Sequence, residues 1–400
     1  MEPGILDKIT SAAFQQFIRA NENADVNTLV LKQQSVLDVP AAIVAEQISG
    51  RKKAKEKFPT FYNSTTIYPR SLNLEQSSSE QTATFKAKIF LQTLPVCKSL
   101  IDLTGGFGVD SFFLSKVFKA VHYLEPDGEL FEIVSRNHNY LGARNITHHN
   151  IRAEVFLAEE QEASAFFIDP SRRLEEKKVF RFSDCQPNVV SLKNNIFAAA
   201  DYLMVKAAPL LDLKLGIEEL GNVTKVFVVS VDNEVKELLL LCKNHFSGEA
   251  SIEAVNLLRS SSEVFSFNFS EEEMTKSDFS DPASYLYEPN ASILKAGAFK
   301  SIGKNFGLNK IQANTHFYTA DILVNEFPGR IFKIVSEVKP EKKVVARFFP
   351  DGKANVIARN YPLSPVELKK KTALNDGGNR YLLAFAGQTK KFVLVADRIK

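Results

Sequence analysis

The chain has 400 residues, more than one hydrophobic core usually holds, so we expect two or three domains. Its 44% hydrophobic and 24% charged residues are typical of a soluble globular protein, and no apolar run approaches the roughly 20 residues that cross a bilayer. The first residues lack the basic and then apolar pattern of a signal peptide, which favours a cytoplasmic protein. Three scattered cysteines, interpreted as buried thiols, argue against a disulfide framework and a zinc cluster, and we expect no metal: Cys97, Cys185 and Cys242.

The net charge of +3 is unevenly distributed along the chain. Residues 331–400 carry 15 Lys and Arg against 6 Asp and Glu, which leaves residues 1–330 with a balance of −6. A basic end on a mildly acidic body favours a polyanionic partner, and nucleic acid is the first candidate. A solvated lysine-rich surface is the alternative.

Residues 1–95 are expected to form a helical region and a connector. Apolar residues recur at helical spacing from Ile9 to Ile18. Asp38 and Pro40 predict the capped start of a helix over 38–48, and this helix runs into a basic segment. A polar loop over 72–83 leads into a further helix at 84–91.

The segment 99–110 predicts a buried strand, a glycine turn and the start of a helix. The apolar run ends in Asp102, and the glycines after it let backbone amides approach a ligand. A second apolar run, 120–124, ends in Glu125, whose carboxylate can accept hydrogen bonds from a ribose diol. The pattern favours a nucleotide-type cofactor over the alternative, a tight turn without a ligand.

The dinucleotide fingerprint fits incompletely, because its third glycine position holds Ser111. Asp102 before the turn, together with Glu125, resembles the first two motifs of the class I S-adenosylmethionine (SAM)-dependent methyltransferases. The resemblance implies an α/β fold with a Rossmann-like sheet over 96–268 and SAM as cofactor. The first acid and its glycines would hold the methionine portion, and the second acid the ribose. Glu154, in an expected third strand at 153–157, is the nearest match for adenine binding. The implied cofactor residues are Asp102, Thr104, Gly105, Gly106, Gly108, Glu125 and Glu154.

A serine-rich segment precedes the glycine strand. The Glu-Gln-Ser-Ser sequence at 75–78 is similar to a segment that lies over the cofactor pocket in some RNA methyltransferases. A plain polar connector is the better-supported interpretation.

A fourth strand, 165–168, runs into Asp169 and Pro170. Ligands of doubly wound sheets lie beyond the carboxyl ends of the strands, so Asp169 should share an edge with Asp102 and Glu125. There the carboxylate and the Pro170 carbonyl can hold an amino group in line with a methyl carbon, which gives both residues a catalytic role. In the alternative interpretation, Asp169 caps a helix and the arginines after it form surface pairs.

The sequence after Asp169-Pro170 departs from both families that it resembles. Methyltransferases of exocyclic amines carry a second Pro and an aromatic residue where this chain has Ser171 and Arg172. Asp-Pro-x-Arg also resembles the uridine-C5 enzymes, which need a Cys after the fifth strand, and this chain has Lys206 and Ala207 there. An amine target is therefore favoured over a ring carbon, and Lys206 is interpreted as structural. Strands are expected at 202–206 and 223–231, and a helix at 233–241.

A polar linker near residue 270 begins a different part of the chain. The sequence segments around residues 104, 169, 287 and 361 resemble those of a group of bacterial THUMP-like-domain methyltransferases. The resemblance implies a ferredoxin-like domain at 269–330 and a basic THUMP-like, RNA-presenting module at 331–400. Tyr287 and His316 are interpreted as domain-interface residues, with contact to the substrate as the alternative. Within the module, the pattern predicts a hairpin over 343–359, a capped helix over 363–371, and strands at 381–385 and 392–396.

These patterns together predict a SAM-dependent methyltransferase of a base in structured RNA, with an exocyclic amine, guanine preferred, as the target and rRNA or tRNA as the partner. The alternatives are a methyltransferase of a protein or small molecule, and a non-catalytic RNA-binding protein that keeps the fold. The residues expected to bind substrate are Ser171, Arg172, Arg173, Arg347, Arg359, Lys369, Lys370 and Arg380.

Overall fold

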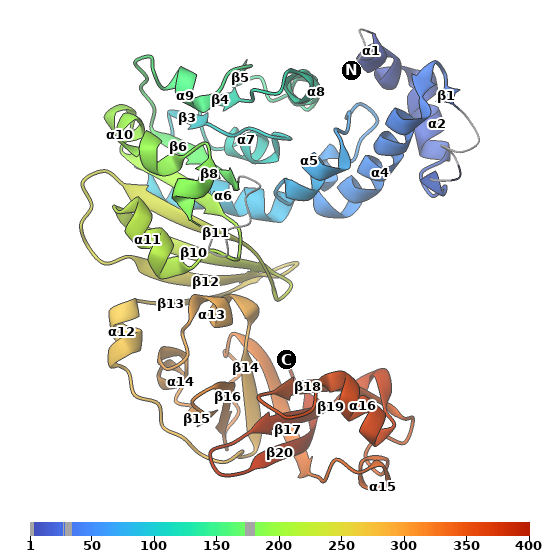
Figure 1. Ribbon diagram of the computed structural model, residues 1–400, viewed down its shortest axis with the longest axis vertical. Helices are drawn as coiled ribbons and strands as arrows, with labels where there is room; N and C mark the ends of the chain where they lie inside the picture. The colour runs from blue at the N-terminus through green and yellow to red at the C-terminus, as the bar shows by residue number, and fades with distance from the viewer. Residues whose placement is uncertain (1–3, 27, 29–33, 173–180) are drawn as a thin grey trace. The chain divides into compact units, whose positions relative to one another are not determined.

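The computed structural model describes residues 4–26, 28, 34–172 and 181–400 (Figure 1). The chain divides into two compact units. The first is Met1–Thr224 with Leu239–Gly248, and the second is Lys225–Leu238 with Glu249–Lys400. None of the helices in the described ranges has the length and apolar character needed to span a bilayer.

The first unit is built on five parallel strands in the order β5-β4-β3-β6-β9. Helices or helical turns connect them, and the central strands are largely apolar because helices cover both faces of such a sheet. All four residues of β6, for example, are buried. Two of the cysteines are buried and Cys97 is half-buried. The strands are β3 (Ser99–Asp102), β4 (Ala120–Leu124), β5 (Ile146–His149), β6 (Ala165–Ile168) and β9 (Tyr202–Ala207). The connecting helices are α7 (Val109–Leu114), α8 (Gly128–Tyr140), α9 (Ala153–Phe156), α10 (Val189–Ala199) and α11 (Leu213–Leu220). A two-stranded ribbon, β7 (Ser171–Arg172) with β8 (Cys185–Gln186), and the short helix η2 (Phe182–Asp184) lie between β6 and α10.

The third strand lies earlier than predicted. Ile146–His149 forms β5, which pairs in parallel with β4, whereas Ala153–Phe156 is the short helix α9. The prediction of a strand at 153–157 is therefore wrong. Only Ala153 and Phe156 of α9 are buried, at a spacing of three that suits one face of a helical turn.

The N-terminal region is helical, as predicted, but one helix start differs. Leu37 and Asp38 both have positive φ, 50° and 57°, and form the turn between two short strands. Such a turn joins antiparallel strands in a hairpin. The helix therefore begins at Ala41 with Pro40 as its N-cap, and the prediction that Asp38 caps it is wrong. The elements of this region are α1 (Ile5–Thr10), α2 (Ala12–Ala20), β1 (Ser35–Val36), β2 (Val39–Pro40), α4 (Ala41–Lys57), η1 (Pro59–Phe61), α5 (Ser71–Gln76) and α6 (Glu80–Thr93).

A β-hairpin replaces the helix predicted over 233–241. β10 (Val223–Val231) is followed by Asp232 and Asn233, with φ of 47° and 68°, and then by β11 (Glu234–Lys243). Two consecutive residues with positive φ form the turn that matches the twist of paired strands. The four leucines 238–241 are all buried, which suits a strand covered on both faces. The sheet continues from β9 through β11 and β10 to β12 (Ser251–Leu257) and β13 (Ser262–Phe267).

The second unit also contains a seven-stranded sheet in the order β15-β16-β14-β17-β20-β19-β18. Its core includes the rings of Phe317, Phe332 and Phe385. The strands are β14 (Tyr285–Pro289), β15 (Asn309–Gln312), β16 (Thr315–Ala320), β17 (Gly329–Glu337), β18 (Lys353–Arg359), β19 (Asn375–Ala386) and β20 (Lys391–Arg398). The helices are α12 (Phe269–Met274), α13 (Ala291–Ala296), α14 (Ser301–Asn305), α15 (Lys342–Val345) and α16 (Pro365–Thr372).

The hairpin predicted over 343–359 is also wrong. Residues 342–345 form α15, and β18 pairs in parallel with β19. Val345 and Phe349 pack into one buried cluster with Leu368 and Leu382, so the apolar residues before the turn belong to a helical segment. The predicted capping box of α16 is confirmed, with Ser364 and Glu367 bonded in both directions. The strands predicted at 381–385 and 392–396 are confirmed within β19 and β20.

Candidate active site at the carboxyl edge of the sheet

Three acidic residues lie at the same edge of the parallel sheet. Asp102 ends β3, Glu125 follows β4 and Asp169 follows β6. In the register of the sheet, Asp102 is opposite Tyr123 of β4 and Phe167 of β6. Because β3 is the central strand of the three and all run in parallel, the acids come together as the sequence predicted.

Asp102 supports the glycine loop from inside the protein. Its carboxylate is fully buried and accepts hydrogen bonds from the backbone N–H of Thr104, at 3.1 Å, and from the hydroxyl of Ser111. Burial raises the pKa of Asp102 to about 7, and the nearby charges of Asp110 and Asp169 act in the same direction. Asp102 thus joins the end of β3 to the loop and to α7.

The glycine loop is packed tightly on one side and open on the other. The N–H of Gly105 donates to the carbonyl of Leu124 at 2.8 Å, and a Cβ at Gly105 would come within 2.1 Å of the Tyr123 ring. Gly106 has φ of +52°, a conformation that favours glycine, and a Cβ there would meet only the Thr104 carbonyl oxygen, at 3.9 Å. The loop therefore leaves space beside Gly106.

Glu125 bridges the end of β4 and the glycine loop. One carboxylate oxygen accepts the N–H of Gly106 at 3.0 Å and the other accepts the N–H of Asp127 at 2.8 Å. Burial raises the pKa of Glu125, and the two backbone hydrogen bonds oppose that shift. An ionised carboxylate offers about four lone-pair positions, so Glu125 keeps capacity for further donors. The side chain of Asn150, after β5, holds the Glu125 carbonyl at 2.8 Å.

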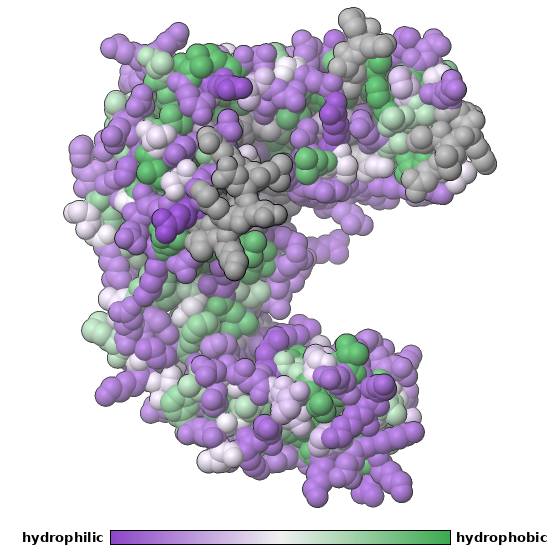
Figure 2. All heavy atoms as spheres, in the orientation of Figure 1, coloured by the Kyte–Doolittle hydropathy of each residue, from purple (hydrophilic) through white to green (hydrophobic). Residues whose placement is uncertain are grey.

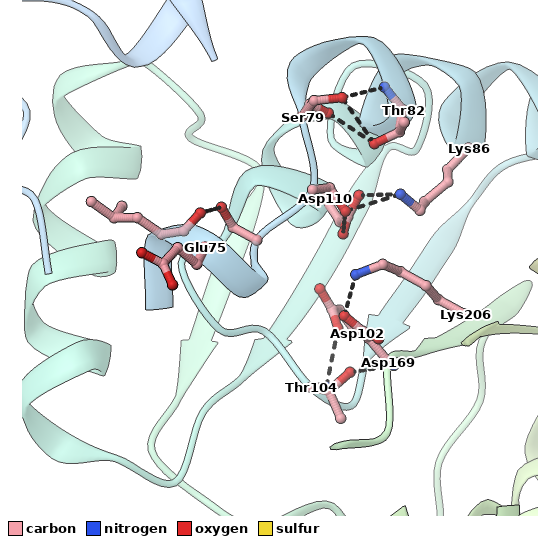
Figure 3. A network of polar contacts seen from close by, with 12 residues as sticks. Glu75, Ser79, Thr82, Lys86, Asp102, Thr104, Asp110, Asp169 and Lys206 are labelled. Carbon is pink, nitrogen blue, oxygen red and sulfur yellow. Dashed lines mark hydrogen bonds and ion pairs between the residues drawn. The ribbon is translucent and has the colours of Figure 1, made fainter. Parts of the chain in front are cut away.

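Asp169 has two polar neighbours, one from the glycine loop and one from β9. Its N–H donates to the Thr104 hydroxyl at 2.6 Å, and its carboxylate forms an ion pair with the ammonium of Lys206, on β9. Figure 3 shows Thr104, Asp169 and Lys206 gathered beside Asp102. Lys206, interpreted from the sequence as structural, therefore contacts the residue predicted to be catalytic.

A second ion pair, between Lys86 and Asp110, lies near the pair of Asp169 and Lys206. Lys86 of α6 is completely buried, and its ammonium is 3.1 Å from Asp110 of α7 and 3.0 Å from the hydroxyl of Ser78 (Figure 3). Burial by itself raises the pKa of Asp110, but the ammonium groups of Lys86 and Lys206 hold it below its usual value. The segment interpreted as a serine-rich connector thus contributes Ser78 to this network.

Sequence reasoning missed Lys86 and Asp110. A signal for Lys86 is present, because it shares the buried stripe of α6 with Ala83, Ala87 and Phe90 at helical spacing. A lysine within such a stripe needs a buried partner. Nothing in the sequence indicates that this partner is Asp110.

The other residues that the sequence assigns to the site, from Glu154 to Arg173, lie in positions that suit ligand binding less well. Glu154 is exposed on α9 and does not end a strand. Pro170 is buried, and Ser171 is exposed with its hydroxyl donating to the Gln186 carbonyl at 3.3 Å. Arg172 belongs to β7, and Arg173 lies outside the described residues.

The basic residues predicted to contact phosphates fall into two groups. Arg359, Lys369 and Arg380 form ion pairs with Glu288, Asp376 and Asp397. Arg347 and Lys370 are exposed and have no ion pair among the described residues. Figure 2 shows mainly hydrophilic side chains over the part of the surface where α15 and α16 lie.

Four of the six histidines form two buried or half-buried pairs near the glycine loop. His138 contacts His148 at 2.9 Å and the Gly108 carbonyl at 2.9 Å, and His122 contacts His149 at 3.0 Å. Within the described ranges, no group of three or more His, Cys, Asp or Glu side chains is arranged to hold a metal ion.

Comparisons with known proteins assign the end of the chain to two domain families. Residues 285–328 match the model of a ferredoxin-like domain, and residues 329–398 match the model of a THUMP domain-like family. The comparison with curated proteins found no match.

Among solved structures, a presumed methyltransferase from Porphyromonas gingivalis W83 has the same architecture over the whole chain. It is 27% identical, with a TM-score of 0.85, and the match covers 100% of this chain and 99% of that one. A presumed methyltransferase from Streptococcus mutans, in complex with SAH, matches 40% of this chain and 95% of its own at 12% identity and a TM-score of 0.30. An rRNA methylase from Streptococcus thermophilus matches 40% and 94% at 13% identity and a TM-score of 0.31. The chain thus combines a Rossmann-like α/β sheet with ferredoxin-like and THUMP-like domains.

Proposed function

We propose that the protein is a SAM-dependent methyltransferase that acts on RNA, with the transferase part at 96–268 and an RNA-presenting module at 331–400. The observation that carries this proposal is the meeting of Asp102, Glu125 and Asp169 at one sheet edge around the glycine loop. A glycine turn that binds no ligand would not require an acidic residue at the end of each of three strands.

The residues at this edge fit the proposed cofactor. The space beside Gly106 permits close approach to the backbone, and Glu125 keeps lone pairs for a ribose diol. We therefore assign the methionine portion to Asp102, Thr104, Gly105 and Gly106 and the ribose to Glu125. When bound, SAM supplies a methyl group on a positively charged sulfur. To Asp169, which follows β6, we assign the orientation of the accepting group, and its ion pair with Lys206 and its partial exposure support this assignment.

Two observations support RNA as the substrate. Residues 329–398 match a THUMP domain-like family, and residues 331–400 carry 15 Lys and Arg against 6 Asp and Glu. Exposed side chains such as Arg347 and Lys370 are suited to phosphates, and such contacts position RNA without selecting its sequence.

Calorimetry with SAM and transfer of a labelled methyl group to total RNA test this proposal on the full-length protein. We expect Glu125→Ala to weaken SAM binding at least tenfold and Asp169→Asn to leave binding intact while reducing transfer at least a hundredfold. Glu159→Gln, at an exposed residue after α9, is the matched control and should change neither.

Two outcomes contradict the proposal. Failure of the wild-type protein to bind SAM removes the cofactor assignment. SAM binding without transfer to any RNA favours the alternatives, a protein or small-molecule substrate or a non-catalytic RNA-binding protein.

A further inference from the structure

The open end of the site is formed by one carboxylate and one ammonium. The ion pair of Asp169 and Lys206 joins the carboxyl ends of two neighbouring strands, β6 and β9. The Lys206 side chain is 11% exposed and that of Asp169 is 34% exposed. A substrate group therefore reaches the pair from the side of Asp169, with the Lys206 ammonium directly behind it.

The charges around Lys206 alternate in sign. Lys86 forms an ion pair with Asp110, and Lys206 forms one with Asp169. The Lys206 ammonium also lowers the pKa of Asp110. Lys206 thus lies close to two carboxylates, those of Asp169 and Asp110. The accepting group thus meets the Asp169 carboxylate, with the Lys206 ammonium bound to its far side.

A positive charge at this place distinguishes between two kinds of acceptor. An amine that attacks a methyl carbon gains positive charge during the transfer, so a neighbouring ammonium opposes the reaction. A hydroxyl oxygen gains negative charge as its proton leaves, and a preorganised ammonium stabilises that charge. Once Asp169 has taken the hydroxyl proton it is neutral, and the Lys206 ammonium is then the charge that acts on the oxygen, so the pair suits oxygen as the acceptor.

The segment after Asp169 agrees with this preference. The amine methyltransferases that Asp169-Pro170 resembles place an aromatic ring where this chain has Arg172, two residues after Pro170. Ser171 is turned to the Gln186 carbonyl and offers no surface on which a base could stack. A sugar hydroxyl does not require such a ring.

We infer that the methyl acceptor is the 2′-hydroxyl of an RNA ribose and that Lys206 selects it by stabilising the developing negative charge on oxygen. This inference rests on the proposed function and replaces the exocyclic amine expected from the sequence. The 2′-hydroxyl is the group by which RNA differs from DNA along its backbone.

The proposed methyl transfer can be written with every bond and proton accounted for by the residues present. The hydroxyl oxygen forms a bond to the methyl carbon, and the electron pair of the broken carbon–sulfur bond stays on sulfur. The hydroxyl proton passes to the carboxylate of Asp169. The products are a methyl ether on the ribose, a neutral thioether and a protonated Asp169, which returns its proton to water.

The position of the methyl group is the first test. Full-length protein is incubated with SAM and total RNA from cells that lack the gene, and the nucleosides are analysed by mass spectrometry. A 2′-O-methylnucleoside, with protection of one phosphodiester bond from alkali, is the expected result. A methylated base overturns the inference and leaves the proposed function standing, whereas absence of both SAM binding and methylation overturns the proposed function itself.

Variants of Lys206 test its role separately. Lys206→Met should reduce kcat at least a hundredfold, with SAM affinity by calorimetry and KM for RNA within about threefold of wild type. Lys206→Arg should restore at least a tenth of the lost rate, since it keeps the charge. Lys119→Met, at an exposed residue before the opposite end of β4, is the control.

An unchanged or increased kcat in Lys206→Met contradicts the inference, because an amine acceptor would not need the ammonium. Circular dichroism and thermal unfolding show whether the variant is folded. The position of the methyl group in the wild-type product decides the matter even where the variant does not fold.

Discussion

The Tyr123 hydroxyl donates a hydrogen bond to the Gly106 carbonyl at 2.6 Å, and the Tyr123 ring occupies the space that a side chain at Gly105 would need. One residue of β4 thereby sets the shape of the whole glycine loop. The loop in turn donates the Gly106 N–H to Glu125, two residues after Tyr123. The first two acids of the proposed cofactor site are thus joined through a single buried ring.

Gly105→Ala should disrupt this arrangement. Its Cβ would lie 2.1 Å from the Tyr123 ring, so the loop or the ring must shift, at a cost of about 1–3 kcal/mol of unfolding free energy. We expect SAM affinity to fall at least tenfold. Gly128→Ala, in α8, is the control because the nearest atom would be 3.7 Å away. Urea unfolding and calorimetry measure both effects, and wild-type affinity in Gly105→Ala would refute the proposed loop contact.

Asp102 should make stability depend on pH in a characteristic direction. Its pKa rises from 3.8 to about 7 on burial, so between these values the folded protein holds a proton that the unfolded chain releases. The contribution of Asp102 to stability therefore falls as pH rises from about 4 to about 7. Asp102→Asn lacks this titration, so its unfolding free energy relative to wild type should increase between pH 5 and pH 8. Urea unfolding at several pH values measures the difference, and parallel curves for the two proteins would contradict it.

The histidine pairs act in the opposite direction. Burial lowers the pKa of His138 to about 3 and that of His148 to about 4, and in each case a neighbouring histidine adds to the shift. Both rings are neutral in the folded protein and bind protons on unfolding below pH of about 6.5, so their contribution to stability is lost as pH falls from about 6.5 to 4.

His148→Gln should weaken this dependence. Glutamine keeps an N–H that can donate to His138 but does not titrate. His245→Asn, at an exposed turn residue with positive φ, is the control because asparagine accepts that conformation. Thermal unfolding at pH 7.5 and pH 5 should show a smaller loss in His148→Gln than in wild type, and an equal loss would count against a buried neutral pair.

The basic residues of the C-terminal module should differ in their effect on RNA binding. Arg347 and Lys370 are exposed and without an ion pair among the described residues, whereas Arg359 donates two hydrogen bonds to the buried Glu288. The double variant Arg347→Ala with Lys370→Ala should reduce the slope of log affinity against log salt by about 1.4–1.8, since each phosphate contact contributes roughly 0.7–0.9.

Arg359→Ala is the comparison for this experiment. We expect its salt slope to stay near the wild-type value, because Arg359 is engaged within the protein. Fluorescence anisotropy with a labelled structured RNA at 50–300 mM salt, roughly the range over which phosphate contacts are weakened, measures the slopes. Equal slopes for the double variant and wild type would remove these two residues from the proposed RNA-binding surface.

The sequence alone determined the parallel sheet and the edge where three acids meet. Apolar runs that each end in an acid are sufficient for this, because parallel strands in one sheet bring their carboxyl ends to the same side. The helix predicted over 233–241 was wrong because no glycine marks the turn before it. Asp232 and Asn233 adopt positive φ as an Asp-Asn pair, so the leucines after them form a strand where a helix was predicted.

Only the tertiary structure decided which charges neutralise one another. Lys86 meets Asp110, Lys206 meets Asp169, and Arg359 meets Glu288 from segments far apart in the chain. The sequence shows that each of these residues is charged, but an ion pair depends on a distance of a few ångströms that chain folding sets. For this reason the proposed preference for a hydroxyl acceptor depends on where the fold places the Lys206 ammonium and could not be proposed from the motif alone.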